Sequence, residues 1–158
     1  MSNVTYSAPA VLLARDNTLH SYCATVVTNG QPIGLNDELT LQPVDPSGAS
    51  GQVFVYGSDQ RIYLYNGSNA PQYCLGFAQP AQDGQPLQVQ SPNSQDPTQQ
   101  WSFSTNNPTL TNVGQPLYSV NDRSGTGSVG DSVAIFPGAS GNNSFSWAFV
   151  ICPQPFPV

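Results

Sequence analysis

Residues 73–101 read YCLGFAQPAQDGQPLQVQSPNSQDPTQQW, and this stretch decides the fold because the rest of the chain repeats its two landmarks. The first landmark is Tyr73, which opens the stretch, and the second is Trp101, which closes it. Tyr22 in YCAT and Tyr118 in YSVN repeat the first landmark. The sequence therefore contains an internal repeat, and a recurring unit of this kind sets the architecture of the whole chain.

A large aromatic residue closes each copy of the repeat: Phe54 in QVFVY, Trp101 in QQWSF and Trp147 in FSWAF. The closing residues are 47 and 46 residues apart, and they follow the opening tyrosines by 32, 28 and 29 residues. Large aromatic residues that recur once per repeat usually serve the core, so we expect these three to pack between the units. The copies fill the chain, which predicts a single domain over 1–158. The units are predicted at about 8–57, 58–106 and 107–152.

Each unit is predicted to contain about four short strands and no helix. In ELTLQPV, PLQVQSP and SVAIFPG, two apolar residues lie two positions apart, which puts each pair on one face of a strand. The pairs are Leu39 with Leu41, Leu87 with Val89, and Val133 with Ile135. The 15 Pro and 14 Gly interrupt every helical pattern. Three all-β units of about 45 residues predict a β-trefoil, because a propeller usually needs about four blades or more.

The charge of the chain argues against polyanionic partners. The net charge is −6, and the cations are Arg15, Arg61 and Arg123, with no lysine. Three cations cannot neutralise a row of phosphates or hold a chain on an anionic membrane, so we expect no nucleic acid partner and no membrane insertion. A neutral partner that forms hydrogen bonds fits this composition better.

The sequence carries no recognisable targeting segment. The N-terminal residues lack a basic region, and the apolar stretch at 11–13 is too short for a signal peptide or a transmembrane span. The N-x-S/T sequons at Asn3, Asn66 and Asn142 arise readily by chance in a chain rich in Asn and Ser, so they do not decide the compartment. We expect a soluble protein, either cytoplasmic or extracellular with its leader already removed.

The cysteines and the single histidine are predicted to be structural. Cys23, Cys74 and Cys152 are widely spaced and form no CxxC pair, which argues against a disulfide framework or a zinc site. We expect buried reduced thiols, with one bridge between Cys23 and Cys152 left open. His20 is the single histidine of the chain, and a lone histidine is more often a structural or surface residue than a catalyst.

Signals for catalysis are weak. Asp37 with Glu38, or Asp122 with Asp131, would supply the two carboxylates of a glycosidase, but the pattern implies no deep cleft around them. The chain contains no G-x-S-x-G, no P-loop and no metal-ligand spacing. We therefore predict that the protein is not an enzyme and that it needs no cofactor and no metal.

The motifs of the middle unit resemble those of the ricin B-chain-type β-trefoil lectins. Repeats in that family carry C-L-D, then G-x-x-hydrophobic-Q-hydrophobic-W, then Q-x-W; the middle unit here has YCLG, DGQPLQVQSP and QQW. The first unit has the weaker Gln52-Val53-Phe54, and the third has Phe145-Ser146-Trp147 without the glutamine. The resemblance covers nearly the whole chain and implies a carbohydrate-binding protein.

The chain departs from the family at the residues that hold galactose-type sugars. Family members use an Asp just after Cys-Leu, an aromatic residue about fifteen positions later and an Asn before Q-x-W. At the Asp position this chain has Thr25, Gly76 and Asn121, and at the aromatic position it has Gln42, Gln90 and Phe136. The half-cystine that usually follows the aromatic residue is absent from all three units, so the local disulfides of the family cannot form.

The third unit retains the most complete set of candidate ligand-binding residues. Asn121 would hydrogen-bond to vicinal hydroxyls, and Phe136 would offer a flat apolar face to a pyranose ring. The further candidates are Asp122, Asp131, Asn142 and Asn143. Two structural readings stay open, in which Asn121 and Asp122 simply form a turn and Phe136 belongs to the core. The alternative sites are Thr25, Asp37, Gln42 and Asp45 in the first unit, and Gln88, Gln90 and Gln99 in the second.

We therefore expect a small lectin that binds a neutral glycan, such as one containing galactose or an N-acetylhexosamine. Two weak sites, or a homodimer, would add avidity for glycoconjugates. One rival is a β-trefoil protease inhibitor that uses a loop at 43–51 or 91–99, and another is a protein-interaction domain that has lost sugar binding. The sequence favours the lectin because inhibitor trefoils do not usually pair YCLG with QQW.

Overall fold

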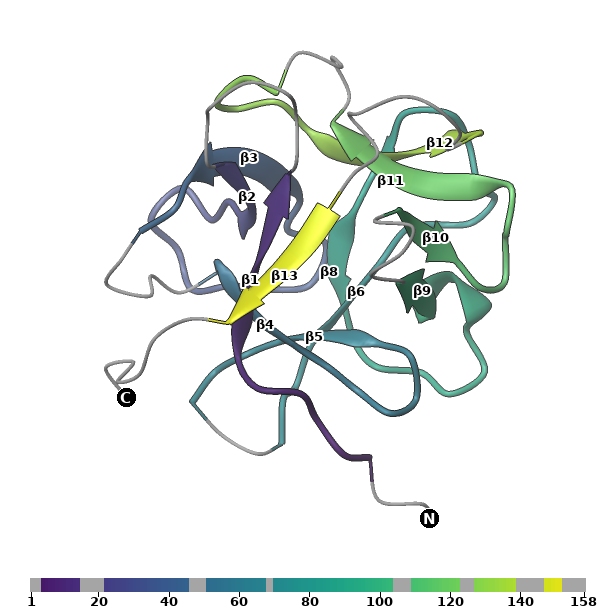
Figure 1. The fold of residues 1–158 in the computed structure, drawn as a ribbon, viewed down its shortest axis with the longest axis horizontal. Coiled ribbons are helices and arrows are strands. Elements are labelled where there is room, and N and C mark those ends of the chain that lie inside the picture. Colours follow the sequence, from purple (N-terminus) through teal and green to yellow (C-terminus); the bar gives the residue numbers. More distant parts are fainter. Residues whose placement is uncertain are drawn as a thin grey trace.

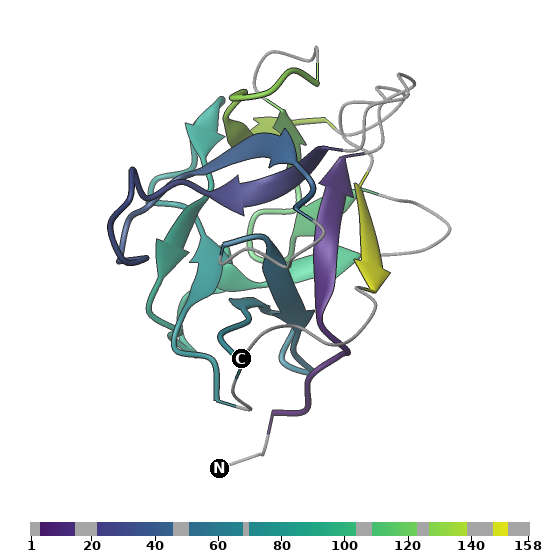
Figure 2. The same ribbon diagram turned by 90° about the vertical axis from the view of Figure 1, so that its left-hand side faces the viewer.

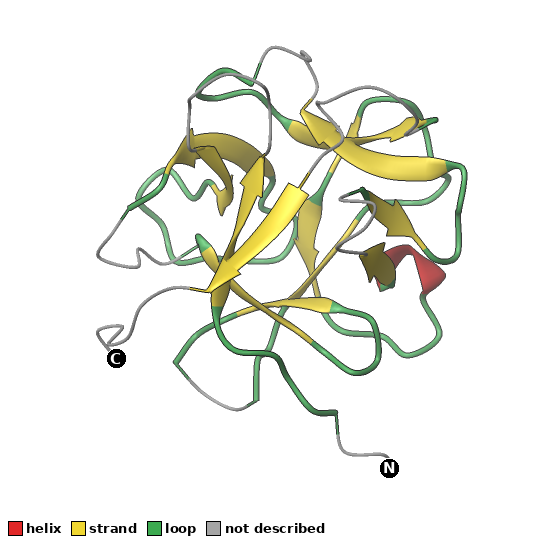
Figure 3. Cartoon of the chain, in the orientation of Figure 1, coloured by secondary structure: helices red, strands yellow, loops and turns green. Residues whose placement is uncertain are grey.

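The computed structural model describes residues 4–14, 22–45, 51–67, 70–103, 109–122, 127–138 and 147–151, which are nearly all strand and loop (Figure 3). The first unit contains β1 (Ala10–Ala14), β2 (Tyr22–Val26), β3 (Leu39–Pro43) and β4 (Val53–Tyr56). The second contains β5 (Ile62–Leu64), β6 (Cys74–Gly76), β7 (Gln85–Pro86), β8 (Gln88–Gln90), the 3-10 turn η1 (Pro97–Gln99) and β9 (Trp101–Phe103). The third contains β10 (Leu110–Asn112), β11 (Tyr118–Asp122), β12 (Val133–Pro137) and β13 (Trp147–Ile151).

The strands play two roles that recur in each unit. The outer strands pair across the unit boundaries, since β4 pairs with β5, β9 with β10, and β13 with β1. The inner strands form antiparallel hairpins, β2 with β3, β6 with β8, and β11 with β12. Figure 1 shows the first and third of these hairpins on either side of the molecule, and Figure 2 shows β1 beside β13, where the chain closes on itself.

Three equivalent turns lock the units to one another. Each lies just before the second strand of a hairpin and has one residue with positive φ: Asn36 at 69°, Gly84 at 75° and Gly130 at 87°. The backbone N–H of that residue donates to a carbonyl of another unit: Asn36 to Val89 (2.8 Å), Gly84 to Ile135 (2.9 Å) and Gly130 to Leu41 (2.8 Å). The first unit bonds to the second, the second to the third, and the third to the first. This closed ring gives the fold its threefold symmetry.

The core lies where the repeat predicts it. Phe54, Trp101 and Trp147 are each 0% exposed, and the six alternating apolar residues of the inner strands join the same cluster. The two indole N–H groups make equivalent bonds, from Trp101 Nε1 to the carbonyl of Leu75 (3.0 Å) and from Trp147 Nε1 to that of Val120 (2.9 Å). The predicted role of the closing aromatic residues as core between the units is confirmed.

A second layer of aromatic residues lies two positions after the first. Tyr56, Phe103 and Phe149 are half-buried and meet one another, with ring centroids 6.1 Å apart for Tyr56 and Phe149 and 5.3 Å apart for Phe103 and Phe149. These residues pack against the main core. The strings QVFVY, QQWSF and FSWAF contain these residues, but the sequence pattern alone assigns them no role.

The cysteines that the structure describes are buried. Cys23 and Cys74 are fully enclosed, and burial raises the pKa of the Cys74 thiol to about 12, which makes that thiol a poor nucleophile at neutral pH. Cys152 and His20 lie outside the described residues, so the bridge between Cys23 and Cys152 stays a prediction.

In the described part of the chain, none of the helical segments has the length and apolar character to cross a membrane.

A partly buried ion pair ties the second unit together. The Asp59 carboxylate accepts hydrogen bonds from the Arg61 guanidinium (2.8 Å) and from the Tyr63 hydroxyl (2.6 Å). The same guanidinium donates to the carbonyl of Asn93 (2.8 Å), which anchors the loop after β8. Burial by itself raises the pKa of Asp59, but the hydrogen bonds from Tyr63 and Arg61 outweigh it and hold that pKa below its ordinary value.

We expect Asp59 to make the fold sensitive to acid. Its pKa is lower in the folded than in the unfolded chain, so its contribution is present above the unfolded value of about 3.9 and is lost as the pH falls through the folded value. Urea unfolding between about pH 5 and pH 2 should show a steeper loss of stability for the wild type than for Asp59→Asn. Parallel pH profiles for the two proteins would contradict this assignment.

Candidate functional site

The third-unit candidates Asn121 and Phe136 share one face of the β11–β12 hairpin. In the register, Asn121 lies opposite Ala134 and Ser119 lies opposite Phe136. Side chains alternate along a strand, and Val120 points into the core, so Asn121 points to the opposite face of the hairpin, on the same side as Phe136. Phe136 is half-buried on this face, whereas its neighbour in sequence Ile135 is fully buried. The reading of Phe136 as a main-core residue is therefore wrong.

Asn121 has a polar atom that the described protein does not satisfy. The residue is only 7% exposed, and its side-chain Oδ1 accepts no hydrogen bond from any residue in the part of the chain that the structure describes. The residue opposite it, Ala134, offers only a methyl group. Leaving a buried acceptor unpaired costs about 1–3 kcal/mol, and a donor that reached this oxygen would recover that cost.

The two acidic candidates of this unit take part in turns. Asp122 follows Asn121 on β11 and therefore points to the opposite side of the hairpin; its Oδ2 accepts a hydrogen bond from the backbone N–H of Gly127. The Asp131 carboxylate accepts from the backbone N–H of Ser128 (2.9 Å) in one of the three equivalent turns. The structure thus does not bring Asp122 and Asp131 to the face that carries Asn121 and Phe136. Asn142 and Asn143 lie outside the described residues.

In the second unit, the protein's own side chains fill the equivalent position. A Cβ atom added at Gly76 would lie 2.2 Å from Oε1 of Gln90 and 3.1 Å from Cγ of Gln99. The two glutamines also bond to each other, from Gln99 Nε2 to Gln90 Oε1 (3.0 Å). The space that a side chain at position 76 would use is therefore already occupied.

In the first unit, the outward polar groups are paired within the hairpin. Thr25 donates to the backbone carbonyl of Cys23 (3.2 Å), and Gln42 donates to the hydroxyl of Thr40 (3.0 Å). Asp37 accepts from the N–H of Gly34 (2.8 Å), as Asp131 does from Ser128 in the third unit. Among the described residues of the three hairpins, the third places a half-buried aromatic ring on the same face as an unsatisfied acceptor.

The glutamine of the Q-x-W motif holds a loop instead of facing outward. Gln99 donates to the carbonyl of Ser91 (2.9 Å) and accepts from the N–H of Asn93 (2.8 Å). Gln52 repeats this pattern in the first unit, with bonds to the Pro43 carbonyl (2.9 Å) and from the Asp45 N–H (2.8 Å). The motif therefore marks a structural clamp. The sequence reveals the recurrence of this motif but not its mechanical role.

The described residues contain no group of three or more His, Cys, Asp or Glu side chains able to hold a metal ion.

No protein-family model and no curated protein sequence matches the chain. The designed threefold-symmetric protein ThreeFoil matches with a TM-score of 0.70 at 15% identity, over 91% of this chain and 99% of its own. The chain is a β-trefoil.

Natural β-trefoil lectins have the same fold. The β-trefoil lectin of the Vibrio vulnificus hemolysin/cytolysin, solved with N-acetyl-D-lactosamine bound, matches with a TM-score of 0.69 at 18% identity, over 94% of this chain and 97% of that one. The C-terminal half of an earthworm R-type lectin, solved with GalNAc, matches with a TM-score of 0.66 at 11% identity, over 90% and 98%. The predicted fold class is confirmed, and the resemblance to ricin B-type lectins holds at the level of the trefoil fold.

Proposed function

We propose that this trefoil is a lectin that binds a neutral glycan through its third unit. The observation that carries the proposal is the buried, unsatisfied Oδ1 of Asn121 on the same strand face as the half-exposed ring of Phe136. A pyranose ring has one apolar face and a rim of hydroxyls, so it needs an aromatic platform and a directed acceptor. A galactose or N-acetylhexosamine unit meets both requirements.

The charge of the chain supports a neutral ligand. The net charge of −6 repels anionic glycans at long range, and no cation lies on β11 or β12 to bind one. The trefoil lectins with bound GalNAc and N-acetyl-D-lactosamine show that this fold accommodates neutral sugars. Binding alone accounts for the Asn121 and Phe136 arrangement, so we propose no catalytic step.

The rival reading, an inhibitor that inserts a loop into a protease, gains less support. In the candidate loop 91–99, Thr98 and Gln99 are buried, and the Gln99 side chain fastens the base of the loop to the body of the second unit. Residues 46–50 of the other candidate loop lie outside the described residues.

A glycan array tests the proposal with matched variants. We expect Asn121→Ala and Phe136→Ala each to weaken binding by about ten-fold or more, because each removes roughly one good hydrogen bond or one stacking face. Phe136→Trp keeps an aromatic platform and should bind. Thr25→Ala alters the equivalent position in the first unit and should bind as the wild type does.

Two results would overturn the proposal. The first is the absence of binding to any glycan by the folded wild type, which would return the protease inhibitor and the protein-interaction domain to consideration. The second is glycan binding that neither Asn121→Ala nor Phe136→Ala changes, which would place the site in another unit.

A further inference from the structure

Gly84 of the second unit lies directly beside Phe136 of the third. Its backbone N–H donates to the carbonyl of Ile135 (2.9 Å), which belongs to the peptide bond that joins Ile135 to Phe136. The strands that flank this contact, β7 and β12, are paired, with Pro86 opposite Ala134. The candidate glycan site of the third unit is therefore bordered by a turn of a different unit.

The turn that carries Gly84 is held at both ends. Gln85 donates its backbone N–H to the carbonyl of Gln82 (3.2 Å), and the Gln85 side chain accepts the N–H of Gln82 (3.2 Å). The Tyr118 hydroxyl donates to the carbonyl of Ala81 (3.5 Å), just before the turn. A border that is already held in this way loses little conformational freedom when a ligand binds against it.

The two equivalent turns show that a side chain fits at this position. Asn36 occupies it in the first unit, where it is exposed and lies beside Gln90 through the equivalent bond to the carbonyl of Val89 (2.8 Å). At Gly130, in the third unit, an added Cβ atom would have no atom within 4 Å among the described residues beyond its chain neighbours. These turns therefore have space for a side chain, and at position 84 that space borders Phe136.

The backbone alone does not account for a glycine at position 84. Gly84 has a φ of 75°, a conformation that favours glycine, but Asn36 adopts a φ of 69° in the equivalent turn. Asparagine tolerates this region better than most residues do. What glycine adds is the absence of a side chain beside the ring of Phe136, and a pyranose ring that stacks on an aromatic platform needs that clearance.

We propose that Gly84 is a specificity-determining residue of the glycan site, so that the site is shared between the second and third units; this inference rests on the proposed function. The bare backbone at Gly84 lets a pyranose ring reach Phe136 from the side of the second unit. It also sets how bulky a substituent the sugar can carry on that edge. In the second unit, by contrast, the equivalent border carries the side chain of Asn36.

The glycan array with matched turn variants of the full chain tests this inference. Gly84→Asn introduces the residue that the first unit carries at the equivalent turn, so we expect the fold to be kept. The half-saturating protein concentration on the array should rise about ten-fold or more, because the new side chain obstructs the sugar. Gly84→Asp, whose residue also tolerates this backbone conformation, should act in the same way. Gly130→Asn makes the same change beside Gln42 and should bind as the wild type does.

Folding is controlled separately from binding. Thermal unfolding of each variant, followed by circular dichroism, gives its midpoint, and the array is read well below all of these midpoints. A loss of binding is then not a loss of folding.

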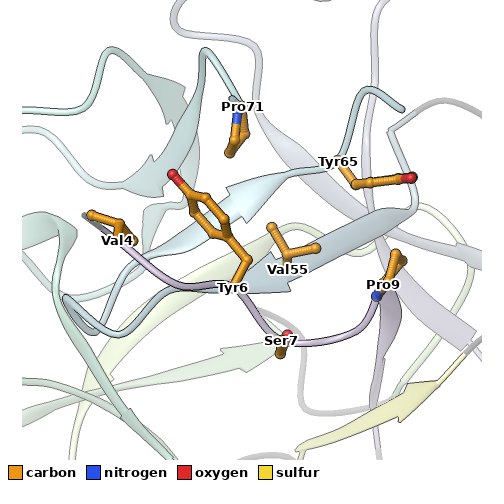
Figure 4. Close-up of a pocket in the computed structure, with 7 residues that line it drawn as sticks. All are labelled: Val4, Tyr6, Ser7, Pro9, Val55, Tyr65 and Pro71. Atoms are coloured by element: carbon orange, nitrogen blue, oxygen red, sulfur yellow. The ribbon is translucent and has the colours of Figure 1, made fainter. Parts of the chain in front are cut away.

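A pocket elsewhere in the molecule supplies a further control. Figure 4 shows Tyr6, Val55 and Tyr65 around this pocket, and none of its lining residues comes from β12 or from the turn 82–85. Tyr6→Ala should therefore bind glycans as the wild type does. A loss of binding in the folded Tyr6→Ala variant would overturn the inference, because the glycan would then occupy this pocket.

The remaining outcomes separate this inference from the proposed function. Glycan binding that Phe136→Ala removes but Gly84→Asn leaves intact would overturn the inference and keep the third-unit site. Equal losses in Gly84→Asn and Gly130→Asn would also overturn it, because the effect would then not depend on Phe136. No glycan binding by the folded wild type would overturn the proposed function and this inference with it.

Discussion

Replacing Trp101 by alanine is expected to lower the free energy of unfolding by roughly 3–5 kcal/mol, a large part of the 5–15 kcal/mol that stabilises a typical domain. The side chain is completely buried and contacts the Phe77 ring, with centroids 6.0 Å apart. Its indole N–H also satisfies the carbonyl of Leu75. The substitution leaves a cavity where the units meet and an unsatisfied carbonyl inside it, and these two penalties add.

Urea unfolding monitored by circular dichroism measures this loss. Trp101→Phe keeps most of the apolar volume but removes the N–H donor, so it should fall between the wild type and the alanine variant. Leu117→Ala, at a residue that is 77% exposed, should change stability by no more than about 0.5 kcal/mol. A loss below about 1 kcal/mol for Trp101→Ala would mean that this residue does not hold the units together.

Gln99→Ala is expected to cost roughly 2–4 kcal/mol, because the side chain is 2% exposed and makes three hydrogen bonds, each worth about 1 kcal/mol. Its removal leaves the Asn93 N–H and the Ser91 carbonyl without their partner. The loop after β8 should also lose its anchor, which amide hydrogen exchange at Asn93 would report directly.

The chain supplies matched controls for this change. Gln52→Ala removes the equivalent clamp of the first unit, which makes two bonds, so its unfolding should show a smaller loss in the same direction. Gln88→Ala, at a half-exposed glutamine on β8, should stay within about 0.5 kcal/mol of the wild type. Equal stability of Gln99→Ala and Gln88→Ala would show that the Q-x-W glutamine is not a clamp.

The pairs Leu39 with Leu41, Leu87 with Val89, and Val133 with Ile135 show why the fold could be predicted. Burial of one strand face imposes a period of two on the sequence, and three equivalent units impose a second, longer period. Both periods are visible without coordinates. The aromatic residues Phe54, Trp101 and Trp147 fill the space between units, so they recur at the longer period.

The candidate site was predictable only in part. Asn121 and Phe136 could be proposed because they occupy the positions where the repeats of ricin B-type lectins carry an Asp and an aromatic residue. The roles of Asp122 and Asp131 could not be read in this way, because an acid that bonds to a nearby backbone N–H looks the same in a sequence as one that faces a ligand.

The sequence by itself determined the threefold repeat, the all-β class and the nine core residues that recur with it, because these follow from periodicity. The tertiary structure alone decided how the polar groups of the three hairpins are paired. Strand register turns Phe136 outward beside Asn121, and side-chain packing places Gln90 in the space above Gly76. Register and packing depend on contacts between residues far apart in the chain, and such contacts leave no local period in the sequence.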